Sequence, residues 1–437
     1  MGLWKATVLW ETVADRAKWF QGFSRRLKRQ LALFLTIMGP GLLTATADND
    51  AGGIATYAIV GAREGYSLLW MIILITISLA IVQEMGARMG AVTGKGLSDL
   101  IREEFGVRWT FFAMLVLLVA NVATCAAEFA GIAASMEIFG VSKYISVPLI
   151  AIMLWILVVK GSYKAVERFL LLFALTFAAY VASGFMARPD WSEVARGMLV
   201  PTFKVEPGFM LLFIATIGTT ITPWMQFFIQ ATVVDKGITI SHYRYEKLDV
   251  LFGAFWTDFI SFFIIVSTGA TLFRAGIPIE TAKDAALALA PLAGEYSTYL
   301  FSVGLFGASA LAAAVLPLST AYAVCEAFGW ESGIDNEFRE APIFFSLFTA
   351  LITIGAVVVL LPGTSLMKVM LRSQEVNGIL LPVILIFMLK LVNNRRIMGQ
   401  HVNSPFFNLI AWITVVCLIG LTVAWFILSL FPALLSS

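Results

Sequence analysis

The sequence predicts an all-α polytopic membrane protein, built from two inverted five-helix repeats and one peripheral eleventh helix. Three observations support this fold class. Of the 437 residues, 59% are hydrophobic and only 13% are charged, with a mean hydropathy of +0.88, which is more apolar surface than a soluble fold can bury. Apolar runs long enough to cross roughly 30 Å of hydrocarbon recur along the chain. Two of these runs are interrupted near their middles by residues that a bilayer should reject.

Residues 1–30 are predicted to form an amphipathic segment on the cytoplasmic surface of the membrane. This segment combines several tryptophans with a basic cluster at 25–29, and it lacks the continuous apolar stretch of a cleavable signal peptide. The pattern is typical of an interfacial helix that is held by anionic lipid, and it requires no specific partner.

The apolar runs predict eleven membrane-spanning helices. They lie near residues 31–60, 66–89, 109–139, 145–160, 166–186, 208–234, 248–273, 298–328, 342–362, 376–392 and 405–432. Residues 31–186 then form the first five-helix repeat, and 208–392 form the second. The segment 187–207 is an extracellular loop, and 393–437 contains the peripheral eleventh helix and the C-terminus.

The distribution of basic residues predicts the orientation. If the N-terminus is cytoplasmic, most of the 30 lysines and arginines fall in segments on the inner side of the membrane, as the positive-inside rule requires. An odd number of helices then places the C-terminus outside. We expect a multi-pass protein of the cell membrane.

The two interrupted runs are the first and the sixth. The first reads Gly39-Pro40-Gly41-Leu42-Leu43-Thr44-Ala45-Thr46-Ala47-Asp48-Asn49-Asp50-Ala51-Gly52-Gly53, and the second reads Gly218-Thr219-Thr220-Ile221-Thr222-Pro223-Trp224. Helices five apart run in opposite directions, so inverted repeats bring the two breaks together at mid-membrane. A pair of such breaks is the best indication in a sequence of a transporter's substrate site.

Asp50 is the strongest candidate ligand in the first break. An ionised carboxylate within a membrane must be paired or hydrated, and such groups are functional by default. Gly52 and Gly53 are expected to release the backbone from helical geometry, which would free carbonyl oxygens for a cation. The alternative is that Asp50 only stabilises the break by bonding to the backbone. For Asp48, an outer contact or entrance role and a capping role are equally compatible with the pattern.

The second break supplies further oxygen donors. Thr219, Thr220 and Thr222 precede Pro223, which lacks an N–H and displaces the carbonyl of Thr219. Carboxylates, hydroxyls and carbonyls are hard ligands. A site with few charged ligands suits Mg²⁺, because this ion keeps several of its bound waters. Each threonine could equally serve helix packing.

These segments together resemble helices 1 and 6 of the Nramp divalent-metal transporters, which carry Asp-Pro-Gly-Asn and Met-Pro-His at the breaks. Further similarities are Glu128-Phe129-Ala130-Gly131 in helix 3 and Ser373-Gln374-Glu375-Val376 with Leu381-Pro382 in helix 10. The resemblance covers almost the whole hydrophobic core. It implies the LeuT-type fold, alternating access, and a divalent cation held between helices 1 and 6.

The departures from the family pattern concern the metal and the proton. Gly53 replaces the asparagine ligand, Thr222 replaces the methionine, Trp224 replaces the histidine, and Cys125 stands where a helix 3 aspartate of the proton route is expected. Loss of the soft sulfur should remove discrimination against Mg²⁺. Loss of the asparagine leaves room for coordinated water. This pattern resembles the Nramp-related magnesium transporters, a branch that takes Mg²⁺ and Mn²⁺ without proton coupling.

The predicted metal ligands are therefore Asp50, Gly53, Thr219 and Thr222. Contacts to an outer shell or to a hydrated ion are predicted for Asp48, Thr220, Gln374, Asn377 and Glu128. Met225 is interpreted as a core methionine, although a slip of helix 6 would bring its sulfur to the site. Buried polar groups at Glu84, Asp258 and Glu326 are interpreted as structural pairs or vestibule residues.

The predicted function is transport of Mg²⁺, and of Mn²⁺, as a largely hydrated ion by alternating access and without proton coupling. No resident cofactor, nucleic-acid partner or obligatory protein partner is expected, and the protein is not predicted to be an enzyme. The alternatives are a proton-coupled Mn²⁺/Fe²⁺ transporter, an amino-acid transporter on the same scaffold, and, in another class, a membrane-embedded enzyme or a metal sensor without transport.

Overall fold

The computed structural model describes residues 49–159, 176, 178–334 and 336–431. The predicted segment 1–30, the candidate ligand Asp48, the first half of the first helix and most of the fifth therefore lie outside the described residues. Within the described part, the regular elements are all helices and none is a strand.

The helices of the first half are α3 (Ala51–Glu64), α4 (Leu69–Thr93), α5 (Leu97–Ile138), α6 (Lys143–Val159), α8 (Ala178–Met186) and α9 (Trp191–Leu199). Those of the second half are α10 (Pro207–Thr220), α11 (Pro223–Asp235), α12 (Tyr243–Thr268) with a π-helical end at Gly269–Phe273, α15 (Ser297–Phe328), α16 (Pro342–Leu360), α17 (Leu366–Val392), α18 (Arg395–Met398) and α19 (Pro405–Leu430). Short turns, including α13 (Ala282–Ala286) and α14 (Ala290–Ala293), connect α12 to α15. Every predicted span overlaps a described helix, although several boundaries differ.

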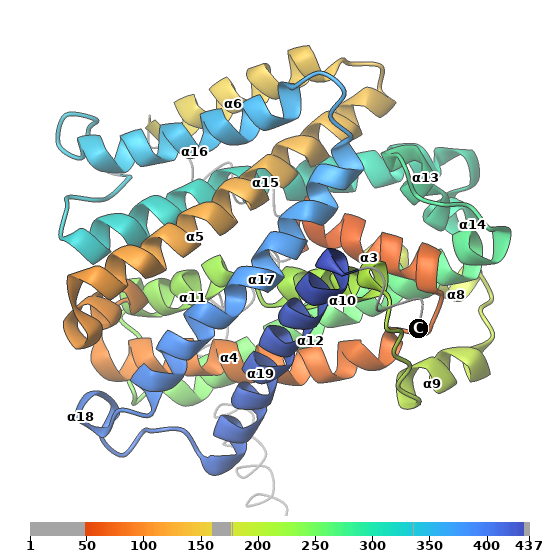
Figure 1. The fold of residues 1–437 in the computed structure, drawn as a ribbon. Helices are drawn as coiled ribbons and strands as arrows, with labels where there is room; N and C mark the ends of the chain where they lie inside the picture. The colour runs from red at the N-terminus through yellow and green to blue at the C-terminus, as the bar shows by residue number, and fades with distance from the viewer. Residues whose placement is uncertain (1–48, 160–175, 177, 335, 432–437) are drawn as a thin grey trace, which may run out of the picture.

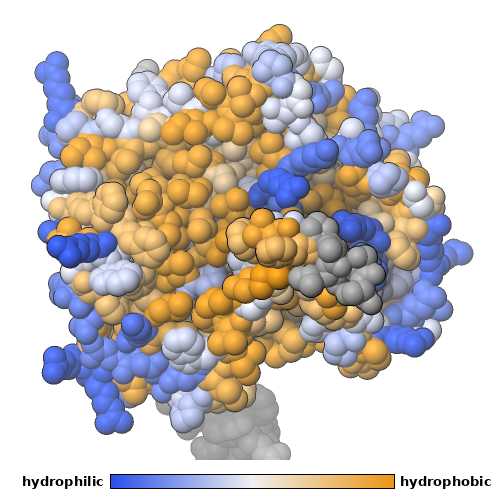
Figure 2. Space-filling view, in the orientation of Figure 1, coloured by the Kyte–Doolittle hydropathy of each residue, from blue (hydrophilic) through white to orange (hydrophobic). Residues whose placement is uncertain are grey.

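Eight helical stretches among the described residues are long and apolar enough to cross a membrane, and Lys143–Val159 is a shorter apolar helix. Several extend beyond the predicted span. α5 begins at Leu97 rather than near 109, and it contains a kink at Gly106, whose φ of 76° is a left-handed conformation that glycine adopts without strain. Figure 2 shows hydrophobic residues across the middle of one face and hydrophilic residues toward its left and right edges, as a protein that crosses a bilayer requires.

The helices pack around a central group that contains both breaks. α5 packs along α15 and α17, and α17 also packs along α10 and α3 (Figure 1). In the stretch that contains α10 and α11, 89% of the 18-residue segment that could cross the membrane is buried inside the protein, whereas in α19 only 17% is buried. α19 is therefore peripheral, and it packs on α17, α10 and α4.

The break in the sixth helix is confirmed. α10 ends at Thr220 and α11 begins at Pro223, which leaves Ile221 and Thr222 between them in non-helical conformations. In the first helix, Asn49 and Asp50 are not helical and α3 begins at Ala51. The prediction that Gly52 and Gly53 leave helical geometry is wrong, because both lie in the first turn of α3.

Candidate functional site

Asp50 forms the N-terminal cap of α3. Its backbone is extended (φ −78°, ψ 179°), and its Oδ1 accepts a hydrogen bond of 2.6 Å from the N–H of Gly53. The first N–H groups of a helix have no partner within it, so a side chain that accepts from them stabilises the helix start. The side chain is almost fully buried. One oxygen is thus engaged in capping, as the structural alternative for Asp50 requires, and this leaves the second oxygen for other partners.

Gly53 contributes an N–H rather than a freed carbonyl. Its N–H donates to Asp50, and its carbonyl lies within the first turn of α3, where carbonyls point along the axis toward the C-terminus. Gly53 therefore does not offer a freed carbonyl to the site. It offers only the space that its missing side chain leaves.

Glu128 of α5 faces the same helix start. Its Oε2 accepts a hydrogen bond of 3.3 Å from the N–H of Ala51, and its Oε1 has no partner among the described residues. Its side chain is fully buried and interacts directly with the carboxyl of Asp50. Two carboxyl groups therefore gather at the positive end of the α3 dipole, where negative charge is favoured.

The second break presents free oxygens. The carbonyls of Thr219 and Thr220 receive no backbone hydrogen bond within the described chain, since Pro223 has no N–H and α11 starts a new helix. The hydroxyls of Thr219 and Thr222 are buried and also have no partner among the described residues. The carbonyl of Thr222 accepts a bond of 3.2 Å from Nε2 of Gln226.

Thr220 is engaged in helix packing. Its hydroxyl donates to the carbonyl of Thr216 at 2.8 Å, and the hydroxyl of Tyr57 approaches it at 2.5 Å. This pair joins α3 to α10 beside the break. Tyr57 was not among the predicted site residues, and the only signal for it in the sequence is its position two helical turns after Asp50.

α17 brings the two breaks together through Gln374. The side chain of Gln374 lies against Gly52 of α3, and its backbone carbonyl lies against Gly218 of α10. Its Oε1 accepts a bond of 2.9 Å from Nδ2 of Asn377, which in turn donates to the hydroxyl of Thr124 on α5 at 3.0 Å. The Nε2 of Gln374 has no partner in the described structure.

The sulfur atoms of Met225 and Cys125 contact other helices. Met225 is fully buried, and its Sδ accepts a bond of 3.5 Å from Nε2 of Gln83 on α4. Cys125 packs closely against Gly355 of α16. In the described ranges no group of three or more histidine, cysteine, aspartate or glutamate residues is placed to hold a metal. The described polar groups at the two breaks are thus carboxylates, hydroxyls and backbone carbonyls, together with the side-chain amide of Gln374.

The other predicted polar positions take structural roles or lie apart. Glu84 pairs with Arg88 at 3.1 Å and accepts from the hydroxyl of Tyr243. Glu326 accepts from the hydroxyl of Ser98 at the start of α5. Asp258 is buried in α12 beside Thr76 of α4.

Comparison with known proteins agrees with this architecture. Residues 41–428 match the family described as natural resistance-associated macrophage protein-like, or Nramp. The chain is 26% identical over 400 residues to the divalent metal cation transporter MntH of Bacillus subtilis, covering 89% of this chain and 91% of the relative. It is 25% identical over 388 residues to the MntH of Caldanaerobacter subterraneus, covering 86% and 89%.

Solved structures show the same fold. A manganese transporter of Eremococcus coleocola aligns with a TM-score of 0.74 at 20% identity, over 89% of this chain and 85% of that one. The transporter MhsT in complex with L-phenylalanine aligns with a TM-score of 0.59 at 15% identity, over 88% and 98%. These likenesses confirm the LeuT-type fold that the sequence predicted.

Proposed function

Because the chain belongs to the Nramp family, whose match spans most of its length, we propose that it transports divalent metal cations across a membrane, and that Mg²⁺ and Mn²⁺ are its substrates. The curated relatives named above are divalent metal cation transporters. In this proposal the ion binds between the breaks of the first and sixth helices, and alternating access carries it across. The N-terminus is cytoplasmic and the C-terminus extracellular.

The observation that carries the choice of ion is the set of free oxygens at the second break. Among the described residues, the buried hydroxyls of Thr219 and Thr222 have no hydrogen-bond partner, and the carbonyls of Thr219 and Thr220 accept no backbone hydrogen bond. The sulfur of Met225 is bonded to Gln83. A soft ligand would favour Mn²⁺, Fe²⁺ or Cd²⁺, whereas an all-oxygen site accepts Mg²⁺.

The proposed ligands are Asp50, Thr219 and Thr222, with space left at Gly53. Few protein charges and several neutral oxygens suit an ion that keeps part of its water shell, as Mg²⁺ does. Gln374, Asn377 and Glu128 are proposed to contact those waters. Thr220 is proposed to act through its bond to Tyr57, which positions α3 beside α10.

Transport is proposed to run without protons. The helix 3 position expected to carry an aspartate is Cys125, and the position expected to carry a histidine in helix 6 is Trp224, which is buried. Neither side chain exchanges protons readily at neutral pH. An inside-negative potential drives a divalent cation inward by about 4.6 kcal/mol per 100 mV, twice the value for a unit charge, so uptake needs no second gradient.

The test is a flux assay with the full chain in liposomes that contain a metal-sensitive dye and, in parallel, a pH dye. We expect uptake of both Mg²⁺ and Mn²⁺, driven by a potassium-diffusion potential, with no acidification beyond that of protein-free vesicles. Uptake of Mn²⁺ with matched acidification and no Mg²⁺ flux would favour the proton-coupled alternative. Absence of any metal flux, with metal binding retained, would favour the sensor.

A further inference from the structure

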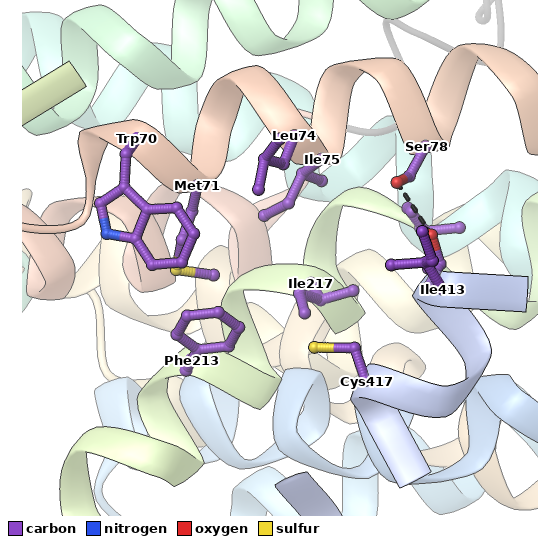
Figure 3. A pocket seen from close by; sticks show the side chains of 11 residues that line it. Trp70, Met71, Leu74, Ile75, Ser78, Phe213, Ile217, Ile413 and Cys417 are labelled. Carbon is purple, nitrogen blue, oxygen red and sulfur yellow. Dashed lines mark hydrogen bonds between the residues drawn. The ribbon is translucent and has the colours of Figure 1, made fainter. Parts of the chain in front are cut away.

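We propose that a groove on the membrane-facing surface, between α4, α10 and α19, binds one acyl chain of a membrane lipid and holds it against the broken sixth helix. The groove encloses a cavity of about 120 Å³. Figure 3 shows side chains of α4, among them Trp70, Leu74 and Ile75, facing Phe213 and Ile217 of α10 and Cys417 of α19 across it. None of the proposed ion ligands lines this groove, so the proposal does not depend on which ion is carried.

The lining of the groove selects an apolar occupant. Its two hydroxyl groups, on Ser78 and Thr414, are bonded to each other at 2.9 Å, as the dashed line in Figure 3 indicates. The remaining lining residues are apolar, apart from the weakly polar thiol of Cys417 and the indole N–H of Trp70, which is buried with no partner among the described residues. A buried water needs two to four polar partners, which this lining does not supply. Hydrocarbon fits the groove, and water or an ion does not.

The position of the groove identifies the source of the hydrocarbon. Leu74 and Ile413 line it and are 54% and 58% exposed, and both lie within helices that can cross a membrane. The groove is thus continuous with the apolar surface that meets lipid. An apolar cavity of about 150 Å³ holds one benzene molecule, so this groove accommodates a segment of an acyl chain while the rest of the lipid lies along the exposed face of α19.

The inner end of the groove reaches the break. Ile221 lines the groove and is also the C-cap of α10, in the break between Thr220 and Thr222. Ile217, one turn earlier, lines it as well, and its carbonyl accepts the last backbone bond of α10 from Ile221 at 2.8 Å. An acyl chain here packs directly on the unwound segment, so its occupancy is coupled to the position of the break.

The experiment uses the full chain in phosphatidylcholine vesicles in which one lipid carries a photoactivatable diazirine on its acyl chain. After irradiation, mass spectrometry maps the adducts. We expect adducts concentrated on the groove-facing residues of α4, α10 and α19. Cys417→Trp places an indole in the groove and should reduce these adducts at least fivefold. Val416→Trp is the matched control, because Val416 is 63% exposed and lies outside the groove, and it should leave them unchanged.

Three results would overturn the proposal. The first is an equal yield of groove adducts in Cys417→Trp and in the unsubstituted chain. The second is a groove yield no higher than that on other exposed apolar positions such as Leu149 of α6, which is 62% exposed. The third is oxidative cross-linking of Cys417 between two copies without lipid adducts, which would mean that a second copy covers the groove. Thermal unfolding establishes that each variant is folded, and Cys417→Phe replaces Cys417→Trp if the larger ring prevents folding.

Discussion

Thr222 is the residue at which the chemistry of the site departs most from the family pattern. It is the N-cap of α11, and its hydroxyl is buried with no hydrogen-bond partner in the described structure. Buried polar groups are normally paired. A hydroxyl with no partner in the described part of the chain, beside carbonyls that receive no backbone bond there, is therefore a candidate ligand. A cation or its water shell would satisfy it.

We predict that Thr222→Met shifts selectivity from Mg²⁺ to Mn²⁺. The thioether is a soft ligand that favours Mn²⁺ and Cd²⁺, and the substitution also removes a hard oxygen. Thr222→Val is the control, because it removes the hydroxyl without adding sulfur. In competition flux assays, the ratio of Mn²⁺ to Mg²⁺ uptake should rise at least fivefold in Thr222→Met over Thr222→Val. Equal ratios in the two variants would remove residue 222 from the ligand set.

Asp50 caps α3 and lies beside the carboxyl of Glu128, and its capping contact can be separated from its proposed contact with the ion. The established contact is the cap of α3 through Gly53; the proposed contact is with the ion. Asp50→Asn keeps an oxygen that can cap the helix, while it removes the charge. Asp50→Ala removes both.

We therefore predict that Asp50→Asn unfolds close to the native temperature yet loses transport, whereas Asp50→Ala loses transport and about 0.5–2 kcal/mol of stability. Thermal unfolding in detergent and liposome flux on the same preparations measure the two effects. Native flux in Asp50→Asn would show that Asp50 serves the helix cap alone.

Among the elements, α17 determines how closely the two breaks approach each other. Gly218 of α10 and Gly378 of α17 face each other, and a Cβ on Gly218 would overlap backbone atoms of Gln374 and Gly378. Helices with small residues at their contact can approach closely within a membrane. At Gly52 the overlapping atoms belong instead to the end of the Gln374 side chain, which can move.

We predict that Gly218→Ala separates α10 from α17 and lowers stability by about 1–3 kcal/mol, the usual cost of overpacking. Gly52→Ala should unfold near the native temperature but displace the Gln374 amide and reduce flux. Gly420→Ala is the control, since a Cβ at this position of α19 meets nothing within 4 Å. Thermal unfolding of the three variants ranks their stabilities. A Gly218→Ala protein as stable as Gly420→Ala would contradict it.

At the scale of the whole molecule, a buried polar network at one end of α4 connects distant parts of the chain. Arg88 pairs with Glu84, donates to the carbonyl of His401 at 2.5 Å, and also bonds to Asn403. Tyr243 of α12 completes the network through Glu84. The network holds α4, α12 and the segment before α19 in one arrangement.

Arg88→Met should destabilise the protein by about 3–5 kcal/mol, because it leaves the carboxylate of Glu84 buried without its positively charged partner. Lys95→Met is the matched control. It breaks the pair with Glu103, whose side chains are 45% and 56% exposed, and exposed pairs contribute only about 0–1 kcal/mol. Unfolding temperatures of both variants in the same detergent give the comparison. Equal temperatures would mean that Glu84 finds another partner.

The sequence by itself determined the membrane class, the approximate spans and the break at Ile221 and Thr222. These follow from local rules: apolar length suits the bilayer, and Pro223 cannot continue α10 whatever surrounds it. Asp50 and the threonines were identified for a similar reason, because a polar residue within an apolar run can be recognised from the sequence alone. The inverted repeats and the orientation stay predictions that rest on those rules.

Only the tertiary structure decided which of those groups remain free. The hydroxyl of Thr220 bonds to Tyr57, the sulfur of Met225 accepts a bond from Gln83, and Gly52 lies in the first turn of α3 against the side chain of Gln374. Each outcome depends on a partner tens to hundreds of residues away in the chain. No local pattern encodes such a contact, because it exists only once the helices have packed.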